Sequence, residues 1–202
     1  MQERTKNTVK RIEHVAVGLF ASKGVAETTV KDIARGAGLS EGALYRHYAS
    51  KDDLVWRTFQ HHYVALAARL GSAAGRETST RDKLAVMIRE ICQAHDDDPA
   101  LFHFLVFVQH GQLSRLEAGT PTPVTVFRDV IDAAIAHGEL PRQEADLATA
   151  LVLGLVLQPM TFLAYGRLAG PQAAYAERIV AAAWATLTSA PPAAAVSEEP
   201  RS

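Results

Sequence analysis

Apolar residues recur along most of this chain at intervals of three and four, which is the spacing of one face of an α-helix. No segment alternates with the two-residue period of a half-buried strand, and no internal repeat is present. The long apolar stripes lie at residues 12–20, 51–70, 80–95, 99–111, 124–137, 144–168 and 172–188. Two shorter helices fit between the first two stripes. The pattern predicts an all-α protein of about nine helices, preceded by a polar arm at residues 1–7.

The segment between the first two stripes has the punctuation of two short helices joined by a tight turn. Thr29 and Ser50 each precede an aspartate by three residues, which is the spacing of an N-cap and its capping-box carboxylate. Gly38 suits the positive φ that ends a helix, and Ser40 can cap the helix predicted at residues 41–47. This arrangement is typical of a helix-turn-helix, which presents its second helix to a DNA major groove.

The same segment resembles the DNA-binding half of the TetR-type (tetracycline-repressor-like) transcriptional regulators. Many positions match at fixed spacing over about residues 8–57, and the resemblance is architectural from there to about residue 190. The matching residues are Thr29, Ile33, Ala34, Ala37, Gly38, Ser40, Gly42, Leu44, Tyr45, His47, Tyr48, Ser50, Lys51 and Leu54. It implies a three-helix DNA-binding domain at residues 1–50 and an effector-binding and dimerisation domain at residues 51–190. The polar, proline-containing tail at residues 191–202 is expected to be disordered.

The resemblance also implies which residues touch DNA. Phosphate contacts would come from Thr29, Tyr45, His47 and Lys51, and base-edge contacts from Ser40, Glu41, Gly42 and Ala43. A glutamate can accept a hydrogen bond from a cytosine amino group, and an alanine methyl can touch a thymine methyl. Arg46 stands where the family usually has an aromatic residue, and it can add a phosphate or guanine contact. Alternatively, Tyr45 and Tyr48 fill the core of the small domain and Glu41 is a solvated carboxylate.

Residues 147–166 contain no charged side chain over a length that could cross a bilayer. Gln158 and Pro159 interrupt this stretch, Asp146 and Arg167 bracket it, and no second span accompanies it, so we reject the membrane interpretation. A helix that is apolar all round must be buried all round, and in so small a chain one face needs a second protein. TetR-like proteins pair their last two helices in a dimer. The predicted interface residues are Leu151, Leu155, Gln158, Phe162, Ile179, Ala182, Ala183 and Thr186.

Aromatic and apolar residues of the middle helices are candidates for the wall of an effector pocket. Charged side chains are nearly absent from residues 99–113 and 147–166, so the predicted effector is small and largely apolar. Each of these residues, taken alone, is more often plain core, and the argument for a pocket is collective. The predicted effector-binding residues are Phe59, His62, Tyr63, Phe102, His103, Phe107, Phe127, Ile131, Met160 and Phe162.

Charge and cysteine content fit this interpretation. The 202-residue chain has a net charge of −1, but residues 1–57 hold ten Lys/Arg against seven Asp/Glu. The excess of positive charge therefore lies where phosphate would be contacted, although so small a difference can also arise by chance. A single cysteine and the lack of a signal-like segment at the start favour a cytoplasmic protein.

Metal binding and catalysis are not predicted. The chain has eight histidines, but His61 and His62 are adjacent and His103 and His110 are two helical turns apart, so neither pair forms a ligand set. Cys92 has only His95 at helical spacing and is better explained as a core residue. We therefore predict no metal, no cofactor and no catalytic residue.

Together these features predict a cytoplasmic, homodimeric transcriptional regulator, most simply a repressor. It would bind double-stranded DNA at a palindromic operator and leave it when a small, largely apolar effector binds. Three alternatives remain open at this stage: a transcriptional activator, a DNA-binding protein of the same fold without sequence preference, and a small helical enzyme with a catalytic pocket. No membrane partner is expected.

Overall fold

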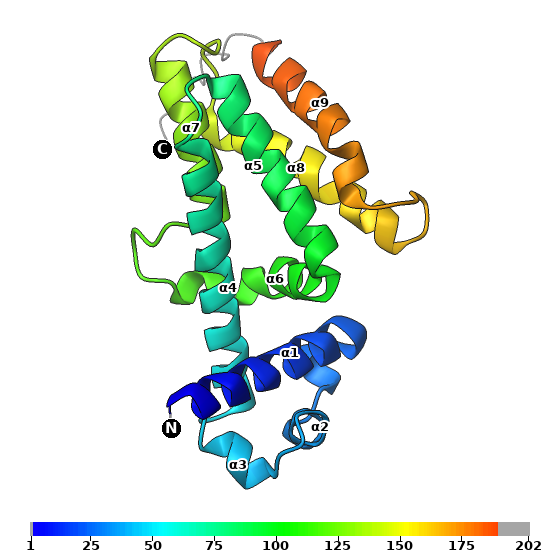
Figure 1. The fold of residues 1–202 in the computed structure, drawn as a ribbon. Helices are drawn as coiled ribbons and strands as arrows, with labels where there is room; N and C mark the ends of the chain where they lie inside the picture. Colours follow the sequence, from blue (N-terminus) through cyan, green and yellow to red (C-terminus); the bar gives the residue numbers. More distant parts are fainter. Residues whose placement is uncertain (1, 190–202) are drawn as a thin grey trace, which may run out of the picture. The chain divides into compact units, whose positions relative to one another are not determined.

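The computed structural model describes residues 2–189, and all regular secondary structure in this part of the chain is helical, as the sequence predicts (Figure 1). It forms nine α-helices and two 3₁₀ turns, at Leu113–Arg115 and Gln172–Tyr175. The helices are α1 (Gln2–Glu27), α2 (Val30–Gly36), α3 (Glu41–Tyr45), α4 (Lys51–Ala74), α5 (Thr80–Asp97), α6 (Pro99–Gln112), α7 (Pro123–Ala136), α8 (Ala145–Ala164) and α9 (Ala176–Thr188). The tail predicted at residues 191–202 lies outside the described residues.

Several predicted helix ends need correction. The prediction of a polar arm at residues 1–7 is wrong, because α1 already begins at Gln2. Gly24 breaks α1 as predicted, with φ 84° and ψ 159°, but one more helical turn follows it. The cap of α5 is Ser79, whose hydroxyl accepts a hydrogen bond from Asp82 N at 3.1 Å; Thr80 instead donates to Glu139 at 2.6 Å. The α8 helix ends at Ala164, four residues before the predicted end.

The chain divides into two compact units. The first contains residues up to 65 together with 97–120, and the second contains residues 66–96 and the chain from 121 onward. Helix α4 contributes to both units. The grouping of α6 with the amino-terminal helices was not predicted; the division by function, with its boundary at residue 50, remains a prediction.

The core of the first unit joins α1, α2, α3, the first half of α4 and α6. Ile12, Ile33 and Leu44 are fully buried in it, so each of the first three helices has one side committed to packing. Phe20 of α1 stacks on Phe104 of α6 with ring centroids 5.5 Å apart. Burial of these side chains fixes which face of each short helix is left exposed.

The second unit packs α8 against α7 and α9. Its α5 helix is tied to the chain that precedes α9 by Asp96, whose carboxylate accepts hydrogen bonds from the backbone N–H groups of Gln172 and Ala173, both at 2.8 Å. The buried Gln172 side chain donates in turn to Val156 O of α8 at 3.0 Å. This polar connection holds the start of α9 beside α8 and so positions their shared outer surface.

Candidate nucleic-acid interface

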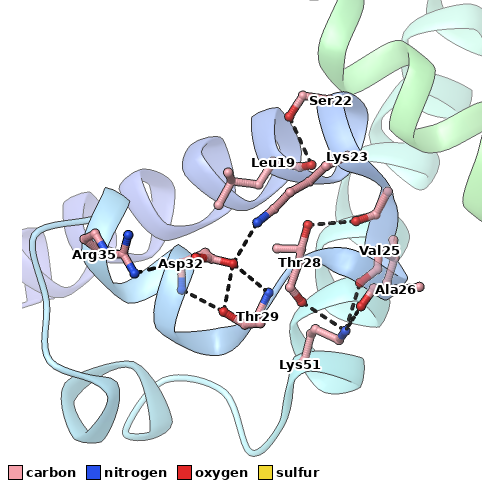
Figure 2. Close-up of polar contacts among 11 residues, drawn as sticks. Leu19, Ser22, Lys23, Val25, Ala26, Thr28, Thr29, Asp32, Arg35 and Lys51 are labelled. Carbon is pink, nitrogen blue, oxygen red and sulfur yellow. Dashed lines mark hydrogen bonds and ion pairs between the residues drawn. The ribbon is translucent and has the colours of Figure 1, made fainter.

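Helix α2 begins with the predicted capping box. Thr29 Oγ1 accepts from Asp32 N, and Asp32 Oδ2 accepts from Thr29 N, both at 3.1 Å (Figure 2). Lys23 of α1 also donates to Asp32 Oδ2 at 2.7 Å. The hydrogen bond from Lys23, followed by those from Thr29, holds the pKa of Asp32 well below its usual range. The start of α2 is thus fixed both locally and by α1.

The turn into α3 follows the glycine signal. Gly38 has a φ of 63°, a conformation that side-chain-bearing residues rarely adopt. Ser40 Oγ then caps α3 by accepting from Ala43 N at 3.2 Å. Leu44 is fully buried in the core of the first unit, and Ala43 is 8% exposed. Contact between the Ala43 methyl and a thymine methyl stays a prediction.

The opposite side of α3 is exposed and mostly polar. Tyr45 is 50% exposed, which leaves its ring available to a partner rather than to the core. The exposed residues of this face are Ser40, Glu41, Gly42, Tyr45 and Arg46, with His47 half-buried at its end. These are donors, acceptors and a cation on one helix of a helix-turn-helix, which is the chemistry needed to contact base edges and phosphates.

Tyr48 belongs to the core, as the alternative interpretation held. It is 1% exposed, and its hydroxyl donates to Glu13 Oε1 of α1 at 2.9 Å. Burial of the Tyr48 side chain is the main cause that raises its pKa, and the neighbouring Glu13 carboxylate raises that pKa further. The Arg57 guanidinium lies 4.9 Å above the same ring and donates to His47 O at 2.9 Å. Arg57 of α4 thereby holds the chain that leaves α3, a role that the sequence did not reveal.

Two of the predicted phosphate contacts have other partners in this structure. Lys51 Nζ donates to the backbone carbonyls of Val25 at 2.8 Å, Thr28 at 3.0 Å and Ala26 at 3.3 Å (Figure 2). The hydroxyl of Thr29 donates to Asp32 Oδ2 at 2.8 Å. In the free protein the Lys51 ammonium is therefore directed at the end of α1, and its contact with a DNA phosphate stays a prediction.

The predicted effector-binding residues are split between the two units. In the first, Phe59 and Tyr63 are buried and stacked 4.7 Å apart, and the Tyr63 hydroxyl donates to Gln109 at 3.3 Å. Burial raises the pKa of Tyr63 to about 12. His62 and Phe102 are also at least partly buried there, whereas His103 and Phe107 are exposed. In the second, Phe127, Ile131 and Met160 are buried and Phe162 is exposed. A single pocket made from them remains a prediction.

An open apolar groove of about 560 Å³ lies between α8 and α9. Its lining includes five of the predicted dimer residues: Leu151, Leu155, Gln158, Phe162 and Thr186. Ala182 of α9 is exposed as well. Ile179 and Ala183, however, are 6% and 1% exposed, so the single chain already covers their side chains, and their part in a dimer interface stays a prediction.

Helix α8 is the one helix in the described part of the chain that is long and apolar enough to cross a membrane. It has 20 residues and a mean hydropathy of 1.9, and 28% of its apolar window is buried inside the molecule. Much of its apolar surface is therefore uncovered in the single chain. Four of the predicted dimer residues that line the groove lie on α8: Leu151, Leu155, Gln158 and Phe162. We therefore interpret the uncovered apolar surface of α8 as one that a protein partner covers.

Two short capped helices, the second with an exposed polar face, define a helix-turn-helix DNA-binding protein. Residues 12–57 match the model of the family described as bacterial regulatory proteins, tetR family. The chain is also 31% identical over 134 residues to a protein named as a mycofactocin biosynthesis transcriptional regulator, MftR, of Mycobacterium tuberculosis; the match covers 66% of this chain and 67% of that protein. The chain belongs to the TetR family of transcriptional regulators, and it binds DNA through the helix-turn-helix.

Other similarities are shorter or structural. The repressor KstR2 of Mycobacterium tuberculosis is 51% identical over 41 residues, which is 20% of each chain. A TetR-family protein from Rhodococcus RHA1 superposes with a TM-score of 0.76 at 20% identity, covering 91% of this chain and 98% of that one. The regulator FadR from Bacillus subtilis, solved in complex with stearoyl-CoA, superposes with a TM-score of 0.71 at 17% identity. The match covers 89% of this chain and 97% of FadR. At these identities, the two solved structures show the fold alone.

Proposed function

We propose that this protein is a repressor that binds a palindromic operator as a homodimer in the cytoplasm and releases it when an apolar effector binds. The observation that carries the proposal is the exposed polar face of α3, held in place by capping on both sides of the turn. A helix this short can contact a major groove usefully only if its surroundings fix its direction. The buried Leu44 and the capping Ser40 supply that fixation.

Within each half-site, the residues of this face divide by chemistry. Glu41 and Arg46 carry an acceptor and a donor group that can read base edges, and Gly42 lets the backbone approach closely. Tyr45 and His47 are suited to phosphate oxygens. Ala43 is 8% exposed in the free protein, and a contact of its methyl with a thymine methyl stays part of the proposal.

Dimerisation would cover the groove between α8 and α9 with the same surface of a second copy. The groove is apolar and contains Gly154, which leaves room for close helix approach. A two-fold axis through this surface would relate two recognition helices, and their half-sites would lie about 34–36 Å apart on the duplex. An operator with two-fold symmetry follows from this geometry.

The effector is proposed to be a largely apolar molecule. The aromatic residues Phe59 and Tyr63 could form part of a wall, with Gln109 as a polar group that orients the ligand. FadR, which has the same fold, was solved with stearoyl-CoA, whose long acyl chain is apolar although its coenzyme A part is charged; only the acyl chain supports the proposed apolar class.

Release would use α4, which runs unbroken from Lys51 to Ala74 and belongs to both compact units. A ligand that binds better to the form with α4 displaced would shift the dimer away from the DNA-binding form. Only a difference in affinity for the two forms can move this equilibrium.

Selection of bound fragments from a random DNA pool, repeated at two salt concentrations, tests the proposal. We expect a two-fold symmetric motif whose affinity exceeds that of unselected DNA by about a thousand-fold. Recovery of no motif, together with binding that collapses as salt rises, would mean that only charge-driven association occurs. In that case the repressor proposal would be abandoned.

A further inference from the structure

The chain that leaves α3 is held by two side chains of α4 that lie one helical turn apart. Arg57 Nη1 donates to His47 O at 2.9 Å, and Asp53 Oδ2 accepts from Ala49 N, also at 2.9 Å. The same Arg57 nitrogen lies 3.8 Å from Asp53 Oδ2, so the two side chains also pair with each other. The short connection between α3 and α4 is therefore fixed at one carbonyl and at one N–H group.

Tyr48 stands between these two backbone groups in the chain, and its side chain is fixed as well. It is buried, and its hydroxyl donates to Glu13 of α1 at 2.9 Å. The Arg57 guanidinium lies 4.9 Å from the centre of its ring, a position in which a cation is attracted to the aromatic face. Arg57 thus contacts both the backbone and a side chain of the segment that follows α3.

The exposed face of α3 needs such support because the helix is very short. It has five residues, and a helix of little more than one turn has almost no stability of its own. At its start the cap from Ser40 fixes its direction. At its end Leu44 O accepts from the N–H groups of both His47 and Tyr48, at 2.9 and 3.1 Å, and Arg57 takes the next step by holding the His47 carbonyl.

We propose that Arg57 is a positioning residue for DNA binding, which fixes the direction in which the end of α3 presents Tyr45 and His47 to the duplex. The inference rests on the proposed operator binding. Without the guanidinium, the exit of α3 samples other directions, and the apparent affinity falls by the fraction of molecules that keep the binding direction. Because Arg57 belongs to α4, it also joins the helix that would carry the effector signal to the helix that reads DNA.

The test compares Arg57→Met, Arg57→Lys and Arg69→Met in the full-length protein. Arg57→Met keeps an aliphatic side chain beside the Tyr48 ring and removes the charge and the donors. Arg69→Met is the matched control, because Arg69 is on the same helix, pairs with a carboxylate and has a side chain 50% exposed, against 52% for Arg57.

Affinity is measured for the selected operator and for an unrelated duplex over a series of salt concentrations. Amide hydrogen exchange of the segment at residues 41–50 is followed in the free protein. Thermal unfolding of each variant establishes that the measurements are made on folded protein.

For Arg57→Met we expect operator affinity to fall about ten-fold, which corresponds to a binding-competent fraction of about one third in each protomer of a dimer. Affinity for unrelated DNA should stay nearly unchanged, because charge-driven binding does not depend on the direction of α3. The slope of log affinity against log salt should keep its wild-type value, and amide exchange at the end of α3 should become faster. Arg57→Lys keeps a charged donor and should recover most of the operator affinity, and Arg69→Met should behave like the wild type.

Two results would overturn the proposal. A phosphate ligand would lower affinity for both DNAs alike and reduce the salt slope by about 0.9 for each arginine lost. A residue that only stabilises the fold would lower the unfolding temperature and leave the ratio of operator to unrelated affinity unchanged. A wild-type protein without any sequence preference would instead overturn the proposed function, whereas the exchange measurement tests the anchoring of α3 without DNA.

Discussion

Leu151 offers a quantitative test of the dimer surface. It lines the groove between α8 and α9 and is 48% exposed in the single chain. Full burial of a leucine side chain is worth about 2 kcal/mol, so covering the exposed half would contribute roughly 1 kcal/mol. A two-fold interface contains the residue twice. Leu151→Ala should therefore cost about 2 kcal/mol of dimerisation free energy, which is about a thirty-fold higher dimer dissociation constant.

Sedimentation equilibrium over a dilution series would measure this constant. Leu113→Ala is the matched control, because Leu113 is 38% exposed but lies outside α8 and α9. We expect the control to dimerise like the wild-type protein. Operator affinity of Leu151→Ala should fall at low protein concentration and recover at high concentration. An unchanged dimer constant in Leu151→Ala, or an equal loss in both variants, would refute the assignment of this groove to the dimer.

Three further results are expected from other parts of the molecule. The hydrogen bond from Lys23 keeps the pKa of Asp32 below its unfolded value of about 4, so the Asp32 carboxylate adds stability above about pH 4. In urea titrations, the stability difference between wild type and Asp32→Asn should therefore shrink as the pH falls below about 4. A difference that does not depend on pH would contradict this assignment. Tyr48→Phe removes the hydrogen bond to Glu13 and should lower the unfolding free energy, measured by urea titration, by about 2 kcal/mol. A change below about 0.5 kcal/mol would argue against that hydrogen bond. Burial raises the pKa of Cys92 to about 11, so a thiol reagent at pH 8 should label it only after unfolding; rapid labelling of native protein would show that it is accessible.

Local signals made the helices and their caps predictable. The capping box of Thr29 and Asp32 and the turn at Gly38 depend on residues within a few positions of one another, and the structure contains both. The start of α1 could not be found in this way. Polar residues at the start of a helix give no stripe, so the same residues are compatible with an exposed helix or with an irregular arm.

The direction of side chains in the DNA-reading motif was harder to predict. Helix α3 has five residues, little more than one turn, so periodicity cannot decide whether Ala43 faces inward or outward. The contacts of Lys51 join residues 23 to 26 positions apart, and no spacing in the sequence signals them. On α9, Ile179 and Ala183 belong to an apolar stripe that fits either the unit's own core or a partner; the spacing alone does not show that both side chains are buried within the single chain.

The central claim is that two copies of α3 read DNA together at a fixed separation. The most direct measurement is affinity for the selected operator with five base pairs inserted between its half-sites, compared with the unmodified operator at the same salt concentration. The insertion turns the half-sites to opposite faces of the duplex. The account predicts that affinity falls about a thousand-fold, to the level of unrelated DNA. Equal affinity for both duplexes would show that the protein does not read two half-sites as a two-fold dimer.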